Sequence, residues 1–443
     1  MFGCRGGHRT RPWKPSGVDE IVTRLNHARR RTLGALLLAL VGLVVIAGCS
    51  GGSIGRETVT STVNATGGGT GTDGSSEPST TREVPPVATV AATPAFGTDG
   101  LSPIEPLTFA VAQGTIDNVQ MTNPDGKVVE QTISADRTSW TVGEPLGFGK
   151  TYTVAGTATG TDGKQVPIQG TWTTVGSDTQ TRNTISPSDN AEVGVAVPVS
   201  VSFGSEPQDR EAVAKRISIT TTPAVEGAWA WIKHDDGRWA LDYRPKDYWP
   251  AGTQVHVEAK LYGVKLDDTS YGAADITSDF TIGRNQVVVA DVNSHEMIVK
   301  RDGQVVASYP ASYGRGGDNG DPNLVTRSGT HVVMTKDAEY LMNNERYGYT
   351  NSLQRWAVRI SNNGEFIHAN PASAGAQGNS NVTHGCINLS NADAEAYFNS
   401  ALYGDPVEIS GTDIFLNSTD GDVYTWAMSW DDWKAKSVPV GTA

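Results

Sequence analysis

The sequence predicts a mainly β protein made of several domains. Its 443 residues exceed the length at which a single hydrophobic core usually stops growing. Glycine is abundant at 50 residues, and charged residues make up only 19% of the chain. Short Val/Thr-rich runs recur between turn signals, which is typical of strands. We therefore set aside an all-helical fold and expect a succession of β-rich domains.

The N-terminal region has the pattern of an export signal. Residues 1–32 carry eight Lys/Arg against two acids, a local net charge of +6, and an uncharged apolar run over 33–46 follows. This run is shorter than the roughly 20 residues that span a bilayer. The tetrad Ile46-Ala47-Gly48-Cys49 resembles the lipobox of bacterial lipoproteins, which implies a signal peptide over 1–48 and a lipidated Cys49. A permanent transmembrane helix is the alternative.

The rest of the chain is acidic. With a total of −13 and a leader of +6, residues 33–443 carry a net charge of −19. A phosphate backbone would repel such a body, so nucleic-acid binding is not expected. Residues 49–100 are rich in Gly, Ser, Thr and Pro and cannot bury a core. We expect them to form a disordered tether between the membrane anchor and the folded domains.

Two similar β-rich units are expected next, over 101–182 and 183–283. Their alternating segments are interrupted by turn dipeptides at Asp125-Gly126, Asp162-Gly163 and Asp236-Gly237. Each unit has the size and the strand pattern of a small β-sandwich. We interpret them as two tandem immunoglobulin-like domains.

A third β-rich unit is expected over 284–410. It contains two hairpin signals, around Asp302-Gly303 and around Asn363-Gly364. A short helix is predicted from the N-cap Ser390 through Leu402, stopped by Gly404.

The tail over 411–443 is expected to form a small Trp-rich subdomain. Trp426, Trp430 and Trp433 would share one face if the tail is helical. Because so short a segment has no core of its own, docking on the preceding domains is favoured over a ligand-stacking role.

The three cysteines leave one unpaired thiol. Cys4 lies in the leader and Cys49 would be lipidated, so Cys386 has no partner for a disulfide. An unpaired thiol in an exported protein indicates that its reactivity is needed, although an inert buried thiol is the alternative. His234 and His256 have no Cys or carboxylate at ligand spacing, so no metal site and no cofactor are predicted.

Residues around the unpaired thiol can activate it. The string Thr383-His384-Gly385-Cys386-Ile387-Asn388 follows His368 after 14 loop-like residues. A thiol needs a neutral imidazole within reach to become a nucleophile near neutral pH. Both His384 and His368 are available. A base on a neighbouring strand would make the more rigid pair, which favours His368.

This pattern resembles the catalytic signature of L,D-transpeptidases. The resemblance extends through 328–333, 375–378 and 430–433 and is strongest to actinobacterial forms with two immunoglobulin-like domains. It implies that Cys386 is the nucleophile and that His368 is the general base, oriented by the Ala369 carbonyl. It also implies an oxyanion hole built from backbone N–H groups around Gly385 and Cys386.

The resemblance assigns further residues to the site. It places His384 beside the nucleophile and implies a mobile lid over 338–356, which is shorter here than is usual in the family. Tyr349 is the candidate substrate tyrosine by position, although a lid residue without direct contact is the alternative. The substrate-binding residues that it implies are Thr383, Asn388, Asn363, Gly364, Met342 and Tyr349.

The implied activity is the formation of 3-to-3 cross-links between peptidoglycan tetrapeptide stems. The Cys386 thiol would form a thioester with a donor stem and release D-alanine, and an amine of an acceptor stem would resolve it. Carbapenems would acylate the same sulfur. The alternatives are an L,D-carboxypeptidase of the same fold and a non-catalytic cell-wall binding protein. We expect a monomer, lipid-anchored at the outer face of the cytoplasmic membrane.

Overall fold

The computed structural model describes residues 87–316, 321–417 and 425–441. The predicted signal peptide, the predicted lipidation site Cys49 and most of the predicted tether lie outside these ranges. Within them, no helix is both long enough and apolar enough to cross a membrane.

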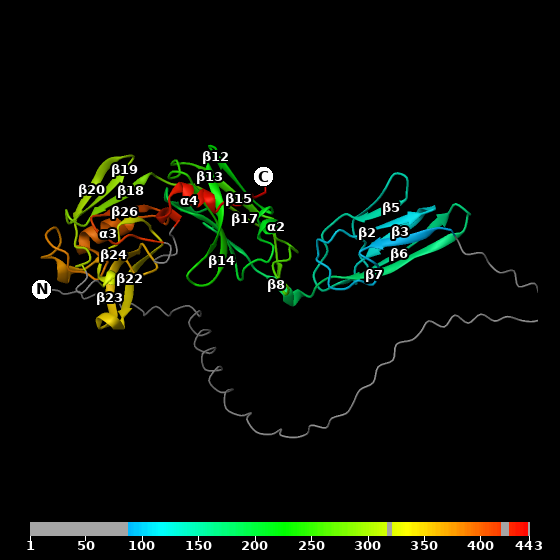
Figure 1. Ribbon diagram of the computed structural model, residues 1–443, viewed down its shortest axis with the longest axis horizontal. Helices are drawn as coiled ribbons and strands as arrows, with labels where there is room; N and C mark the ends of the chain where they lie inside the picture. Colours follow the sequence, from blue (N-terminus) through cyan, green and yellow to red (C-terminus); the bar gives the residue numbers. More distant parts are fainter. Residues whose placement is uncertain (1–86, 317–320, 418–424, 442–443) are drawn as a thin grey trace, which may run out of the picture. The chain divides into compact units, whose positions relative to one another are not determined.

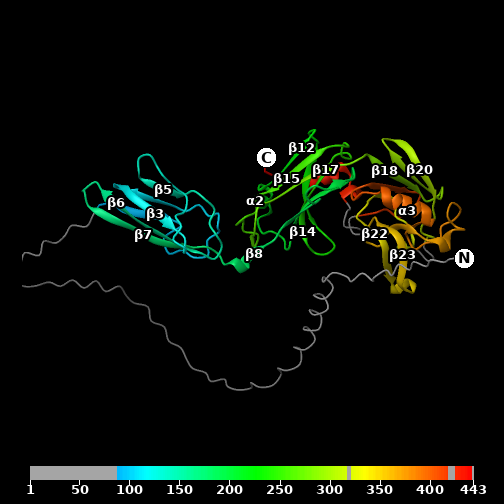
Figure 2. The same ribbon diagram turned by 180° about the vertical axis from the view of Figure 1, so that it is seen from behind.

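The first domain is a β-sandwich (Figures 1 and 2). One sheet has the strand order β1-β2-β5-β4 and the other β3-β6-β7. The core between them holds the fully buried Trp140 and Trp172, whose ring centroids lie 6.1 Å apart. The strands are β1 (Thr89–Thr93), β2 (Thr108–Ala112), β3 (Gly114–Thr122), β4 (Gln131–Ile133), β5 (Ser139–Val142), β6 (Thr151–Gly160) and β7 (Gln165–Thr173).

Two predicted boundaries of this domain were wrong. Strand β1 falls inside the predicted tether, where it pairs with β2 in antiparallel register along its whole length. Its mostly small Ala and Thr side chains do not show the alternation of large apolar residues that marks a strand in the sequence. The segment is a strand because it pairs with β2. At the other end, β8 (Gln180–Thr181) pairs with β16 (Tyr271–Gly272), so the second domain begins before residue 183.

The second domain is also a β-sandwich. Its sheets have the orders β13-β14-β11-β9 and β10-β17-β15-β12. The strands are β9 (Thr184–Ser186), β10 (Glu192–Val193), β11 (Val199–Phe203), β12 (Ile217–Thr222), β13 (Gly227–Lys233), β14 (Trp239–Pro245), β15 (Gln254–Ala259) and β17 (Ile276–Ile282). A short helix, α2 (Arg210–Ala214), precedes β12.

The two histidines of this domain each face a carboxylate. His234 Nε2 lies 3.2 Å from Asp242 Oδ2, and His256 Nδ1 lies 2.8 Å from Asp279 Oδ1. Spacing along the sequence did not reveal these partners because both aspartates come from other strands. No group of three or more His, Cys, Asp or Glu side chains suited to a metal ion occurs in the described part of the chain.

The third domain combines two sheets and one helix. The orders are β20-β19-β18-β26-β21 and β22-β23-β24-β25. The strands are β18 (Gln286–Asp291), β19 (Glu296–Arg301), β20 (Gln304–Pro310), β21 (Gly329–Val332), β22 (Thr335–Asn344), β23 (Tyr349–Arg359), β24 (Phe366–Ala369), β25 (Ile387–Leu389) and β26 (Pro406–Ser410). Both predicted hairpins are confirmed, since β19 pairs with β20 and β23 with β24.

The predicted helix is α3 (Asn391–Ser400), which packs on the core shared by the two sheets. Ser390 caps it as expected, because its side chain accepts the N–H of Asp393. The predicted end was too late. Ala401 already has an extended backbone. Its carbonyl accepts a hydrogen bond from Lys336 Nζ at 2.6 Å instead of one from a further turn of helix.

The C-terminal tail docks on the second domain, as expected. It forms the short elements η6 (Thr425–Ala427) and α4 (Trp430–Ala435) rather than one helix. The indole N–H of Trp433 donates to the Ala228 carbonyl at 2.9 Å. The three tail tryptophans nevertheless converge, since their rings surround the guanidinium of Arg244.

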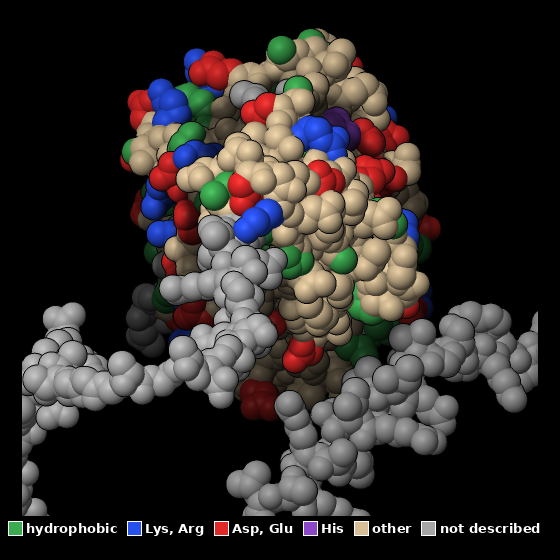
Figure 3. Space-filling model, turned by 90° about the vertical axis from the view of Figure 1, so that its right-hand side faces the viewer, with side chains coloured by type: hydrophobic (Ala, Val, Ile, Leu, Met, Phe, Trp, Pro, Cys, Tyr) green, Lys and Arg blue, Asp and Glu red, His purple; other side chains and the backbone are tan. Residues whose placement is uncertain are grey.

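Charged side chains of both signs are interspersed on the face shown in Figure 3. That face carries no continuous basic stretch of the kind that follows a nucleic-acid backbone.

Candidate active site

Two neighbouring strands bring the predicted nucleophile and base together. Strands β24 and β25 run parallel, with His368 opposite Asn388 and Ile367 opposite Ile387. Cys386 directly precedes β25, so this register places it beside Phe366, two residues before His368 on the neighbouring strand. The 14-residue segment between the two motifs makes the connection that returns the chain to a neighbouring strand.

His368 is held as a neutral base. Its side chain is buried, and its Nδ1 lies 3.0 Å from the Ala369 carbonyl. A carbonyl only accepts, so Nδ1 carries the proton and Nε2 keeps its lone pair. Burial lowers the pKa of His368 to about 4, so the ring is uncharged at neutral pH. This is the orienting contact that the resemblance implied.

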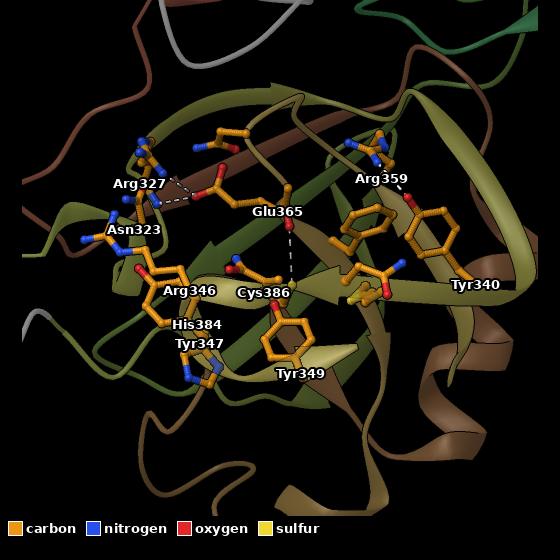
Figure 4. A pocket seen from close by; sticks show the side chains of 16 residues that line it. Asn323, Arg327, Tyr340, Arg346, Tyr347, Tyr349, Arg359, Glu365, His384 and Cys386 are labelled. Carbon is orange, nitrogen blue, oxygen red and sulfur yellow. Dashed lines mark hydrogen bonds and ion pairs between the residues drawn. The ribbon is translucent and has the colours of Figure 1, made fainter. Parts of the chain in front are cut away.

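Cys386 is held as a neutral thiol. Its sulfur donates to the Gly364 carbonyl at 3.7 Å, as Figure 4 shows. Burial raises its pKa to about 12, while the backbone N–H of Phe366 and the charge of Arg359 act in the opposite direction. A nearby base is therefore required to generate the nucleophile.

Two cavities meet at the sulfur. The larger has a volume of about 350 Å³ and the smaller about 240 Å³. Four residues line both cavities: Met342, Tyr349, His384 and Cys386. The larger also contains the predicted Asn363 and Gly364, whereas His368, Thr383 and Asn388 line the smaller. Apart from Gly385, every predicted site residue of the catalytic domain thus lines one or both of these cavities.

Thr383 braces the loop that presents the sulfur. Its Oγ1 donates to the Cys386 carbonyl at 2.7 Å and accepts the Gly385 N–H at 3.1 Å. The Gly385 carbonyl accepts from Thr326 Oγ1 at 2.8 Å. Gly385 has a φ of +113°, a backbone conformation that residues with a side chain rarely adopt, which explains why glycine occupies this position. Thr383 therefore shapes the loop as well as lining the smaller cavity.

His384 contacts the lid. Its ring stacks on Tyr347 with centroids 4.9 Å apart, and its Nε2 lies 3.3 Å from a guanidinium nitrogen of Arg315. Burial and the charge of Arg315 lower the pKa of His384. A neutral ring held between a tyrosine and an arginine fits a supporting role better than that of a base.

The predicted lid is the hairpin of β22 and β23, with η4 (Glu345–Tyr347) at its tip. The tip is fastened to Asp321, whose Oδ2 lies 2.8 Å from both Tyr347 Oη and an Arg346 guanidinium nitrogen. Tyr349 packs with Met342 and Cys386, and burial and the nearby sulfur raise its pKa. Its position therefore fits the candidate substrate tyrosine.

Asn388 lines the smaller cavity through a buried side chain. The residue is buried, and its Nδ2 lies 3.3 Å from Ser373 Oγ. Its Oδ1 has no hydrogen-bond partner within the part of the protein that the structure describes.

Comparisons with known proteins match both halves of the fold. A bacterial Ig domain model matches residues 98–265, and an L,D-transpeptidase catalytic domain model matches residues 285–409. L,D-transpeptidase 5 of Mycobacterium tuberculosis is 47% identical over 353 residues, which cover 80% of this chain and 78% of that protein. The chain belongs to the L,D-transpeptidase family.

Two further proteins are similar to this chain. L,D-transpeptidase 2 of Mycobacterium tuberculosis is 34% identical, with 76% of this chain and 82% of that protein covered. A solved structure of the LD transpeptidase LdtMt1 in complex with imipenem is 31% identical, covers 51% of this chain and 97% of that chain, and has a TM-score of 0.42. The matches to L,D-transpeptidases 5 and 2 show that the protein is an L,D-transpeptidase, an enzyme of a family that acts on peptidoglycan peptide stems.

Several residues of this L,D-transpeptidase site were not found from the sequence. Glu365 is buried beside the larger cavity, where it accepts the backbone N–H of Arg327 at 3.0 Å and the Ser361 hydroxyl at 2.9 Å. His331 Nδ1 lies 3.6 Å from the same carboxylate. Arg359 lines the larger cavity. These residues are far apart in sequence and form no motif, so only the fold reveals their contacts.

Proposed function

We propose that this enzyme forms 3-to-3 cross-links between peptidoglycan stems through a thioester on Cys386. The observation that carries the proposal is the pairing of a half-buried thiol with a neutral imidazole whose Nε2 is available, both lining one cavity. This pairing allows the base to remove the thiol proton as the sulfur attacks.

The reaction has two steps. In the first, His368 Nε2 takes the proton of Cys386 while the sulfur attacks the carbonyl of the third residue of a donor tetrapeptide. The tetrahedral intermediate collapses, His368 returns the proton to the departing nitrogen, and D-alanine leaves. In the second, an amine of an acceptor stem gives a proton to His368 and attacks the thioester, and the thiol is regenerated.

The oxyanion of each intermediate would be stabilised by backbone N–H groups of the loop before β25. The Gly385 N–H already binds Thr383 Oγ1, so we assign the larger contribution to the N–H of Cys386. Loss of one such donor typically raises the barrier by about 3 kcal/mol.

Two cavities that share the sulfur favour transfer to a second stem over hydrolysis. A carboxypeptidase needs room for one peptide and a water, whereas a transpeptidase must bind donor and acceptor at the same thiol. We therefore rank cross-linking above carboxypeptidase activity.

Product mass tests this proposal. Full-length enzyme incubated with a disaccharide-tetrapeptide should release D-alanine and form a cross-linked dimer. Cys386→Ala should abolish both, and His368→Gln should slow them by roughly 10²- to 10⁴-fold. Tripeptide without dimer would show a carboxypeptidase instead.

Carbapenem labelling separates an enzyme from a wall-binding protein. A carbapenem should add its mass to the unmutated protein and not to Cys386→Ala. The absence of any adduct on the unmutated protein would contradict the role of Cys386 as nucleophile.

We further propose that the protein is a monomer held by a lipid on Cys49 at the outer face of the cytoplasmic membrane. The support is the basic and apolar leader that ends at Ile46-Ala47-Gly48-Cys49. Radiolabelled palmitate should enter the protein in cells and be lost in Cys49→Ala. Equal labelling of both proteins would refute the anchor.

A further inference from the structure

Three arginines line the larger cavity, and two of them are already paired. Arg327 lies 3.6 Å from a carboxylate oxygen of Glu365, and Arg346 lies 2.8 Å from one of Asp321. Arg359 makes no ion pair with any residue that the structure describes. Arg359 is therefore the arginine of this cavity whose positive charge can pair with an anionic group of a ligand.

The position of Arg359 is fixed without its charge being neutralised. Its guanidinium donates to the Ser361 carbonyl at 3.2 Å and to Tyr340 Oη at 3.0 Å. It also lies 4.5 Å from the centroid of the Phe366 ring. These contacts are all to neutral groups, so they orient the planar fork while N–H donors remain for another acceptor.

Arg359 lies near the reacting sulfur. Figure 4 shows Arg359 and Tyr340 to one side of Cys386, with Glu365 and Arg327 to the other. Phe366, on which the guanidinium rests, begins the strand that carries His368. A peptide whose scissile carbonyl is at the sulfur therefore enters the cavity that Arg359 also lines.

The two cavities differ in charge. The larger is lined by three arginines and one acidic residue, Glu365, whereas the lining of the smaller contains no Asp, Glu, Lys or Arg. An anionic part of a ligand is therefore stabilised in the larger cavity. Guanidinium groups bind carboxylates in a two-pronged geometry, which makes a carboxylate the best match.

We propose that Arg359 is a specificity-determining residue that binds a carboxylate of the stem peptide held at Cys386. This inference rests on the proposed function, because it names the group by which that site recognises its donor. Two carboxylates have the required chemistry: the C-terminal one of the departing D-alanine, and a side-chain carboxylate within the acyl half of the donor.

Matched donors distinguish these two sources. Acylation of the full-length enzyme would be measured with a tetrapeptide, with its C-terminal carboxamide, and with a form whose internal carboxylates are amides. Arg359→Met should lower kcat/KM for the unmodified donor by about 10- to 100-fold. If the carboxylate that Arg359 binds is replaced by an amide, kcat/KM of the unmutated enzyme should fall by a similar factor. On that donor, Arg359→Met should then cause no further loss.

Two variants serve as controls. Arg359→Lys keeps the charge without the fork and should recover part of the loss. Arg355→Met removes an arginine from the same strand, but this side chain is 59% exposed, pairs with Glu339 and lines neither cavity, so it should leave the rates unchanged. If Arg359→Met slowed all three donors equally, the residue would be structural and the proposal would be wrong.

A binding measurement separates this inference from the proposed function. Cys386→Ala cannot form a thioester, so its affinity for the intact tetrapeptide and for the amides can be measured by calorimetry. Arg359→Met in that background should remove the preference for the carboxylate form. If the unmutated enzyme released no D-alanine, the proposed function would fail. Absence of a carboxylate preference in the binding experiment would overturn the role of Arg359.

Discussion

At the scale of single residues, the site keeps both reacting groups uncharged. Burial raises the pKa of Cys386 to about 12 and lowers that of His368 to about 4, and each shift disfavours the charged form. Between these values the resting enzyme holds a thiol and a neutral imidazole rather than an ion pair. The proton then moves only when a substrate carbonyl is in place to be attacked.

Alkylation with iodoacetamide gives a pH test of this state. Because the thiolate forms only as the pH approaches about 12, the rate at Cys386 should keep rising with pH from 6 to 11. The imidazolium of His368 appears only below about pH 5, so it does not stabilise a thiolate in this range. Peptide mapping would measure the rate at this cysteine, with Cys386→Ala as the blank. A plateau below pH 8 would indicate a preformed ion pair.

At the scale of elements, the lid is a two-stranded hairpin joined to the domain mainly through β23. Leu341 and Leu353 face each other across its strands, and both are about half exposed. A two-stranded hairpin is only marginally stable by itself. Contacts of its tip therefore decide how often it covers the cavities, and Asp321 supplies two of them.

Asp321→Ala should loosen the lid. The substitution removes the acceptor of the Tyr347 hydroxyl and the partner of Arg346, so the tip should open more often. Amide exchange over 343–349 should become several-fold faster, as measured by mass spectrometry, with little change in thermal stability. Glu339→Ala, which removes an exposed pair within the hairpin, is the control. Unchanged exchange at the tip would show that the stacking on His384 suffices.

At the scale of the whole molecule, the tail joins the catalytic domain to the domain that precedes it in sequence. Trp426 donates its indole N–H to the Ala196 carbonyl at 2.8 Å, and Val438 and Gly441 form backbone bonds to the second domain. Arg244 is buried at the centre of this contact and donates to the Met428 carbonyl at 3.0 Å.

Arg244→Ala should release the tail. The mutation removes hydrogen bonds to the Thr425 and Met428 carbonyls together with contacts to three tryptophan rings. The expected loss is about 2–4 kcal/mol of unfolding free energy, measured by denaturant titration. Proteolysis near the tail should also become faster.

Arg210→Ala is the matched control for this loss. Arg210 lies 5.2 Å from the Trp239 ring on the surface, so its removal should cost less than about 0.5 kcal/mol. Equal losses in the two variants would contradict the role of Arg244 in docking.

Local features were predictable from the sequence. The Asp-Gly and Asn-Gly turns, the cap at Ser390 and the motif around Cys386 depend on residues a few positions apart, whose geometry the chain itself dictates. The same holds for the order of the three β-rich domains, since alternation of apolar residues marks each strand without reference to its partner.

Other features were decided only when distant segments came together. The strand at Thr89–Thr93, the Gly364 carbonyl that accepts from the thiol, the fastening of the lid to Asp321 and the unpaired Arg359 all depend on neighbours far away in sequence. Burial and the local electric field arise from packing, so cavity charge and shifted pKa values have no counterpart in a linear pattern. The sequence by itself determined which residues can react, and the tertiary structure decided their protonation and the groups that surround them.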